Sequence, residues 1–268
     1  MLPEHTLAAY LRALEDGADG VECDVRLTRD GHLVCVHDSR LERTSNGHGR
    51  VSAHTLGQLE RLDFGSWHRG GAGLATAEAT RVLTLDRLLR SLREAGRPVR
   101  LLVETKHPNR YGAEVERRLV ALLRAHDLVT PTPDDPVRVT VMSFSPMAIR
   151  RVRRLAPALP TVLLLEALPP IAPVGRLPFG TRIAGPGIRL VRSRPNLVPA
   201  LRAAGNQVYV WTVNRPTDLE LVLGLEVDGV ITDRPAEVLA HLGRTARRMG
   251  SPVSETTPVA DEGSAGRR

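Results

Sequence analysis

The sequence predicts an α/β protein built around a mainly parallel β-sheet. Short β-branched segments alternate with helical segments along most of the chain, a pattern typical of parallel strands joined by right-handed crossovers. With 268 residues, 42% of them hydrophobic, the chain can bury a large core. Length alone leaves open whether that core belongs to one α/β barrel or to two small domains.

The first expected elements are a helix, a strand and a hairpin. Thr6 can cap a helix that begins at Leu7 and is closed by Gly17, and a strand follows over residues 19–25. The next apolar segment, residues 32–38, comes after only TRDG. That connection is too short for a helical crossover, so we expect the chain to fold back through Asp30-Gly31 as an antiparallel hairpin.

The helix–strand alternation resumes after an irregular region. Residues 39–82 turn to Gly, Ser, His and Arg, which indicates an insertion. The expected helices cover residues 84–96, 113–127, 145–157, 196–207, 217–226 and 235–243. The segments that can join one parallel sheet are residues 21–25, 101–105, 139–144, 161–165, a weak strand near 182–188, 209–213 and 229–233. These seven strands belong to a region over residues 1–243, and residues 244–268, without apolar periodicity, are expected to form a disordered tail.

Composition argues against several classes of protein. The chain has no apolar run long enough to span a bilayer and no secretory signal, so we expect a soluble cytoplasmic protein without stable membrane insertion. Cys23 and Cys35 lie in strands without metal-ligand spacing and are expected to be buried thiols. The formal charge of +7 comes from scattered arginines, and only 3% of residues are aromatic, so no nucleic-acid partner is expected. The oligomeric state stays open.

Three carboxylates mark a candidate metal site. Glu22 and Asp24 share one face of the first strand, and Glu104 lies toward the end of the next parallel strand. Three uncompensated acids would repel one another, so a divalent cation is the natural resolution. All-oxygen ligands favour Mg²⁺ or Ca²⁺ over zinc. The plainer alternative is an edge strand with a solvated face.

Two further residues could act beside the metal. Lys106 is the only lysine in the chain and shares its side of the strand with Glu104, so it offers a compact positive charge that an anion such as phosphate could bridge to the metal. His37 ends the hairpin strand and suits general acid catalysis near neutral pH. Lys106 could instead form a surface pair and His37 could be a turn residue. The other eight histidines are expected to be mostly solvated.

Seven short motifs occur in an order that resembles the glycerophosphodiester phosphodiesterase family. They are residues 2–10, 21–38, 43–49, 101–108, 142–144, 211–214 and 228–235, so the resemblance covers roughly residues 2–240. It implies a TIM (β/α)₈-type barrel with an insertion after the first hairpin. It also implies metal-dependent hydrolysis of glycerophosphodiesters, small-molecule substrates, to an alcohol and glycerol 3-phosphate.

The resemblance also assigns roles to residues. It implies that Glu22, Asp24 and Glu104 are metal ligands, that His37 is a catalytic acid or base, and that Lys106 binds phosphate and takes part in catalysis. It places three further residues at the substrate mouth. These are Glu4, Trp211 and Asn214.

The sequence departs from the family at its beginning. Members of the family carry His-Arg-Gly on a first strand that precedes the Pro-Glu segment, and here Pro3-Glu4 follows Met1-Leu2 directly. The barrel therefore lacks its first strand, and we expect the natural reading frame to encode that strand upstream. The tripeptide at residues 68–70 lies in the insertion and is interpreted as coincidental. Two other functions stay open, namely a catalytically impaired phosphate-binding remnant and a phospholipase D-like barrel enzyme.

Overall fold

The computed structural model describes residues 2–68, 80–167 and 175–244. Residues 69–79 of the expected insertion and residues 245–268 of the expected tail lie outside these ranges. The strands are β1 Gly20–Leu27, β2 Leu33–Cys35, β3 Val99–Thr105, β4 Val137–Ser143, β5 Thr161–Leu165, β6 Ile183–Pro186, β7 Gln207–Val210 and β8 Gly229–Val230. The α-helices are α1 Leu7–Glu15, α2 Leu56–Leu59, α3 Leu85–Arg93, α4 Glu114–Ala125, α5 Pro146–Leu155, α6 Ile188–Ser193, α7 Leu197–Ala203, α8 Pro216–Gly224 and α9 Pro235–His241.

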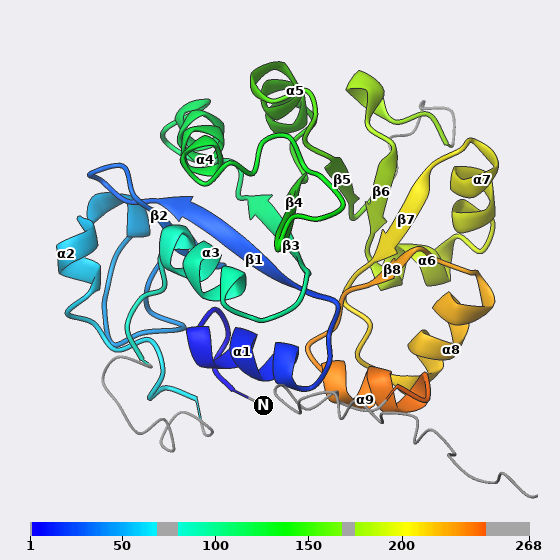
Figure 1. Ribbon diagram of the computed structural model, residues 1–268, viewed down its shortest axis with the longest axis horizontal. Helices are drawn as coiled ribbons and strands as arrows, with labels where there is room; N and C mark the ends of the chain where they lie inside the picture. The colour runs from blue at the N-terminus through cyan, green and yellow to red at the C-terminus, as the bar shows by residue number, and fades with distance from the viewer. Residues whose placement is uncertain (1, 69–79, 168–174, 245–268) are drawn as a thin grey trace, which may run out of the picture.

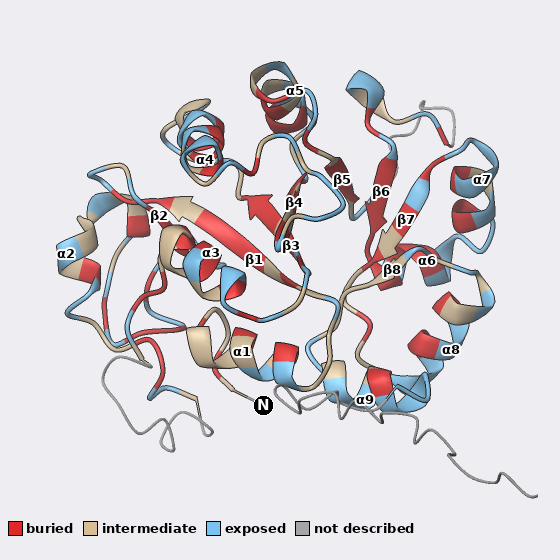
Figure 2. Cartoon of the chain, viewed as in Figure 1, coloured by how far each residue is buried: buried red, intermediate tan, exposed pale blue. Residues whose placement is uncertain are grey.

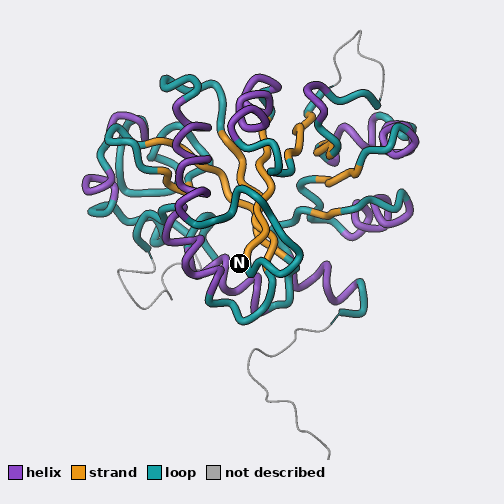
Figure 3. Tube along the Cα trace, turned by 45° about the horizontal axis from the view of Figure 1, so that its top comes forward, coloured by secondary structure: helices purple, strands orange, loops and turns teal. Residues whose placement is uncertain are grey.

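The strands form one curved sheet with helices along its outer side (Figure 1). The strand order is β2-β1-β3-β4-β5-β6-β7-β8, and every neighbouring pair is parallel except β1 with β2. The seven parallel strands and the antiparallel hairpin expected from the sequence are therefore confirmed. Among the described residues β8 pairs only with β7, and the sheet does not close on β1. The tube view shows the strands in the centre of the molecule with helices around them (Figure 3).

Local capping chemistry explains where the helices begin. The hydroxyls of Thr6, Thr84 and Ser145 each accept a hydrogen bond from a backbone N–H in the first turn of α1, α3 and α5. In the hairpin, Gly31 has a φ of 86°, which a glycine adopts without steric cost, and its N–H donates to the Thr28 carbonyl.

Some elements differ from the sequence-based expectation. The short helices α2 and α6 were not predicted, because four and six residues are too few for a clear helical periodicity. The strand expected over 209–213 ends at Val210, so Trp211 lies just beyond β7. The last strand is only two residues long.

Alternation along β1 separates the core from the site. Val21, Cys23 and Val25 are buried against α1, α3 and α4 in the largest apolar cluster, so the alternate residues, which include Glu22 and Asp24, lie on the opposite, inner face of the sheet. The buried strands and the inward stripes of the helices appear in red in Figure 2. Both cysteines are free and buried, as expected. Part of the insertion packs on β2 through a separate cluster that includes Leu41, Leu59 and Phe64.

No helix within the described ranges combines the length and the apolar character needed to cross a bilayer.

A fully buried carboxylate joins α4, α5 and the end of β3. Glu116 accepts hydrogen bonds from His107 Nε2 at 2.6 Å and from Arg151 Nε at 2.7 Å. Burial tends to raise the pKa of Glu116, but these two hydrogen bonds and charges hold it below its usual value. The carboxylate is therefore ionised and paired at neutral pH.

We expect Glu116→Ala to lower the free energy of unfolding by about 1 to 3 kcal/mol, because it leaves the partly buried side chains of His107 and Arg151 without their partner. Glu114→Ala is the matched control, since Glu114 on the same helix pairs with Arg117 and Arg118 on the surface, and its loss should have a much smaller effect. Urea unfolding of both variants measures the difference. Equal effects would show that the buried pair contributes no more than an exposed one.

Candidate functional site

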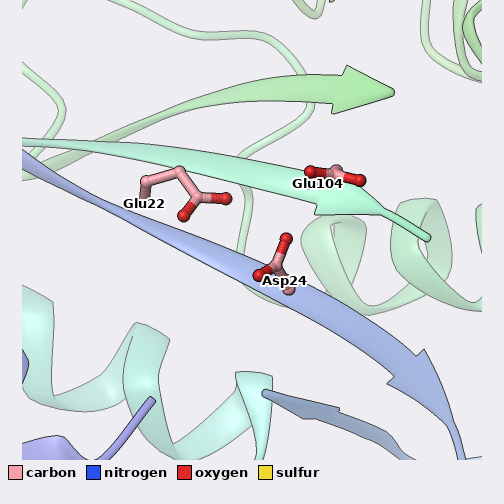
Figure 4. Close-up of side chains that lie close together, drawn as sticks. All are labelled: Glu22, Asp24 and Glu104. Atoms are coloured by element: carbon pink, nitrogen blue, oxygen red, sulfur yellow. The ribbon is translucent and has the colours of Figure 1, made fainter. Parts of the chain in front are cut away.

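Three carboxylates converge on the inner face of the sheet. Glu22 and Asp24 come from β1 and Glu104 from β3, and the register places Asp24 directly opposite Glu104. Each can offer one oxygen such that all three oxygens lie within 4.8 Å of one another. Figure 4 shows the three side chains gathered between the two strands. The convergence expected from the sequence is therefore present.

Asp24 is held by two cationic or polar neighbours. One of its carboxylate oxygens lies 2.9 Å from Lys106 Nζ and the other lies 2.9 Å from His5 Nε2. Burial alone would raise the pKa of Asp24, but the contacts with His5 and Lys106 outweigh it and hold the pKa well below its usual value. Asp24 is thus ionised in the folded protein.

For Glu22 and Glu104, the neighbouring positive charge does not outweigh the effects of burial and of the other carboxylates on the pKa. Burial raises the pKa of Glu22 well above its usual value, and the charges of Asp24 and Glu104 raise it further. Burial and Asp24 raise the pKa of Glu104 to about 7, although Lys106 Nζ lies 3.0 Å from its carboxylate. One ammonium group therefore does not neutralise the three carboxylates.

The donor set fits a divalent cation. Ca²⁺ binds oxygens at about 2.3 to 2.6 Å, so two ligands on opposite sides of it are about 4.6 to 5.2 Å apart, and Mg²⁺ needs about 4.0 to 4.2 Å. Separations within 4.8 Å match this scale. A bound dication would also lower the pKa of Glu22 and of Glu104, because it stabilises their charged forms. The cluster can therefore hold a metal ion.

Two cations lie at the carboxyl ends of the same strands. Arg26 and Lys106 each follow an acid by two positions, Asp24 and Glu104, so all four side chains belong to the same face of β1 and β3. Arg26 donates from Nε at 3.0 Å and from Nη2 at 2.6 Å to the His37 carbonyl, which fixes the end of the hairpin. Along both strands, the acidic side chains are thus followed by basic side chains toward the carboxyl end.

His37 itself stays on the surface. Its side chain is 53% exposed and its Nδ1 lies 2.7 Å from Asp38 Oδ1. Within the described chain it makes no hydrogen bond or ion pair with any of the three acids. Its role as a catalytic acid stays a prediction.

The three residues expected at the substrate mouth are each engaged in the fold. Glu4 forms a bidentate pair with Arg43 at 2.7 and 2.6 Å. Trp211 donates from Nε1 to the Gly185 carbonyl at 2.7 Å and packs edge-on against Phe144. Asn214 ties the end of β7 to the segment after β8, since its amide donates to Asp233 and its carbonyl accepts from Thr232. Their substrate contacts stay predictions.

Sequence reasoning missed His5. The histidines other than His37 were expected to be mostly solvated, but the side chains of His5, His107 and His126 are only 12 to 13% exposed and each contacts a carboxylate. His5 reaches Asp24 while its Nδ1 contacts the Tyr10 hydroxyl at 2.6 Å, and its φ of 54° is unusual for a residue with a side chain. The available signal was its position between Glu4 and the helix cap Thr6.

The raised pKa of Glu104 predicts a pH dependence in the metal-free protein. The folded state holds a proton on Glu104 up to about pH 7, whereas the unfolded chain releases it near the ordinary pKa of 4.5. The stability from this proton is present below about pH 4.5 and is lost as the pH rises to about 7. Glu104→Gln should therefore gain stability relative to the parent between about pH 5 and pH 8, as urea unfolding in EDTA would measure. A difference that does not change with pH would contradict the pKa shift.

Comparisons with known proteins agree with this geometry. A model of the glycerophosphoryl diester phosphodiesterase family matches residues 1–237. A protein of Mycobacterium tuberculosis named "Probable glycerophosphodiester phosphodiesterase 1" is 46% identical over 240 residues, which are 90% of this chain and 88% of that protein. The glycerophosphodiester phosphodiesterase of Bacillus subtilis is 33% identical over 236 residues, which cover 87% of this chain and 80% of that protein.

Solved structures share the fold. A phosphodiesterase of Oleispira antarctica, solved in complex with the product sn-glycerol-3-phosphate, is similar with a TM-score of 0.76 at 24% identity, over 90% of this chain and 92% of that chain. The glycerophosphodiester phosphodiesterase of Agrobacterium tumefaciens has a TM-score of 0.69 at 27% identity, over 90% and 94% of the two chains. The expected barrel-type fold is confirmed.

Proposed function

The chain belongs to the glycerophosphoryl diester phosphodiesterase family, and we propose that it hydrolyses glycerophosphodiesters to an alcohol and glycerol 3-phosphate. The observation that carries the proposal is the group of three acids and Lys106 on adjacent parallel strands. A phosphodiester is an anion, and this group offers it a metal site with a fixed positive charge beside it.

Glu22, Asp24 and Glu104 are the residues that would hold the ion, Mg²⁺ or Ca²⁺. An ion held there would supply electrostatic stabilisation of the negative charge on the phosphate oxygens. Lys106 is shared between Asp24 and Glu104, so its ammonium is fixed in position and charged. The pKa of Lys106 is raised, because the two carboxylates outweigh the opposing effect of burial. The Lys106 ammonium can therefore donate a hydrogen bond to a phosphate oxygen and keep its proton.

His37 is the candidate for proton transfer. Hydrolysis breaks the bond between phosphorus and the alcohol oxygen, and that oxygen must gain a proton as water adds to phosphorus. The His37 imidazole, oriented by Asp38 at Nδ1, leaves Nε2 to make this transfer. His5 keeps Asp24 ionised and in place, as a positioning residue.

Hydrolysis of glycerophosphocholine, a lysophospholipid and bis(p-nitrophenyl) phosphate, each with Mg²⁺, with Ca²⁺ and with EDTA, tests the proposal. We expect metal-dependent release of glycerol 3-phosphate from glycerophosphocholine. Faster cleavage of the lysophospholipid would favour the phospholipase D-like alternative. Binding of glycerol 3-phosphate without turnover of any substrate would favour the phosphate-binding remnant.

A further inference from the structure

A cavity of about 300 Å³ is lined in part by Lys106. Its walls come from the end of β1, from the insertion and from the loop between β3 and α4. A volume of about 300 Å³ is at the small end of the range for ligand sites. It is large enough for one polar group the size of a substituted sugar alcohol. None of the three acids lines it.

The charged residues that line this cavity are all cations. They are Arg26, Arg50, Lys106 and Arg110, and the polar groups among the other lining residues are uncharged, from Ser39, Ser52, Asn109 and Tyr111. No aspartate or glutamate lines the cavity. A concave surface with one sign of charge concentrates ligands of the opposite sign.

Arg50 and Arg110 differ from many arginines of this protein. Arg43, Arg151 and Arg244, like others, form ion pairs with carboxylates. In the described part of the chain, neither the Arg50 nor the Arg110 guanidinium has a carboxylate partner, and the one contact of Arg110 is with the ring of its neighbour Tyr111 at 5.4 Å. Their hydrogen-bond donors are therefore available to an incoming anion.

The loop that carries Arg110 is held in place before any ligand arrives. The Tyr111 hydroxyl donates to the Ser52 carbonyl at 2.8 Å, which joins the loop to the insertion. Asn109 donates to the Lys106 carbonyl at 3.2 Å and accepts from the Tyr111 N–H at 2.9 Å. A wall that is already ordered loses little conformational freedom on binding, which favours affinity.

We propose that this cavity binds an anionic substituent on the alcohol half of the substrate, so that the enzyme prefers glycerophosphodiesters whose alcohol carries an additional phosphate or carboxylate. The inference rests on the proposed function, because Lys106 belongs both to the cavity and to the phosphodiester site. Arg50 and Arg110 are the residues that set the preference. Each planar guanidinium group can donate two parallel hydrogen bonds to a pair of phosphate or carboxylate oxygens.

Two ligands that differ by one phosphate test the proposal. Glycerophosphoinositol and glycerophosphoinositol 4-phosphate are titrated by calorimetry in EDTA, and kcat/KM for both is then measured with metal. We expect the phosphorylated ligand to bind about tenfold more tightly or better, and the excess to fall with added salt. Arg50→Gln with Arg110→Gln should bring the ratio of the two dissociation constants toward one.

Arg124→Gln with Arg154→Gln is the matched control. It removes the same charge from exposed positions near the carboxyl ends of α4 and α5 and should leave the ratio at its parental value. Equal affinity of the parent for the two ligands, or the same loss in both double variants, would overturn the anion site. Binding in EDTA does not need turnover, so this result stands even if no glycerophosphodiester is hydrolysed. Absence of hydrolysis with both ligands would count against the proposed function alone.

Discussion

Glu104→Ala is expected to reduce kcat/KM for glycerophosphocholine by about 10³-fold or more, because loss of a metal ligand removes several kcal/mol of transition-state stabilisation. Excess EDTA should reduce the activity of the parent by a similar factor. Calorimetric titration with Mg²⁺ and with Ca²⁺ would show whether the variant has lost its ion. Glu220→Gln, which changes an exposed acid on α8, is the control and should keep both properties.

The three acids should differ in their effect on the metal-free fold. Burial and the charge of Asp24 raise the pKa of both Glu22 and Glu104, so replacing either with Gln removes a group whose charged form is disfavoured. Asp24 instead accepts from His5 and Lys106, and Asp24→Asn should destabilise the protein because it breaks a buried charge pair. Thermal unfolding in EDTA measures these changes. Full turnover by the parent in excess EDTA would refute the metal assignment altogether.

His37→Ala is expected to lower kcat by about 10² to 10⁴, the usual contribution of general acid–base catalysis. The metal affinity should stay near the parental value, because the His37 imidazole contacts Asp38 and none of the three acids. The pH–rate profile should lose the limb that reports the histidine.

His32→Ala provides a matched control on the same hairpin. The side chains of His32 and His37 are both 53% exposed, and each lies beside an aspartate, Asp30 and Asp38. A purely structural or surface-charge effect would appear in both variants. An unchanged pH–rate profile in His37→Ala, or an equal loss in His32→Ala, would dismiss His37 as the acid.

Much of the architecture follows from patterns that lie close together in the sequence. Hydroxyl caps at Thr6, Thr84 and Ser145 mark helix starts, and the short connection through Asp30-Gly31 forces a hairpin. These features were predictable because capping and turn geometry involve residues only a few positions apart. The strand near 182–188, which the sequence marks only weakly, is the four-residue β6, and the strand expected over 229–233 is reduced to the two-residue β8.

The acid cluster was predictable for a related reason. The two-residue period of a strand puts Glu22 and Asp24 on one face, and the parallel arrangement brings the carboxyl end of β3 beside them. Motif order then assigned the family, which the comparisons confirm. Strand periodicity and motif order can both be read without knowing how the loops run.

Contacts that depend on loop paths were decided by the tertiary structure alone. His5 reaches Asp24 across 19 positions, and Tyr111 joins the insertion across 59, separations that no local period encodes. The same is true of the basic cavity, because Arg26, Arg50 and Arg110 come from three separate segments. The sequence by itself determined which groups lie on which face of each strand, since backbone geometry sets that locally. Which distant side chains pair with those groups and set their pKa values was determined only when the helices and loops packed over the sheet.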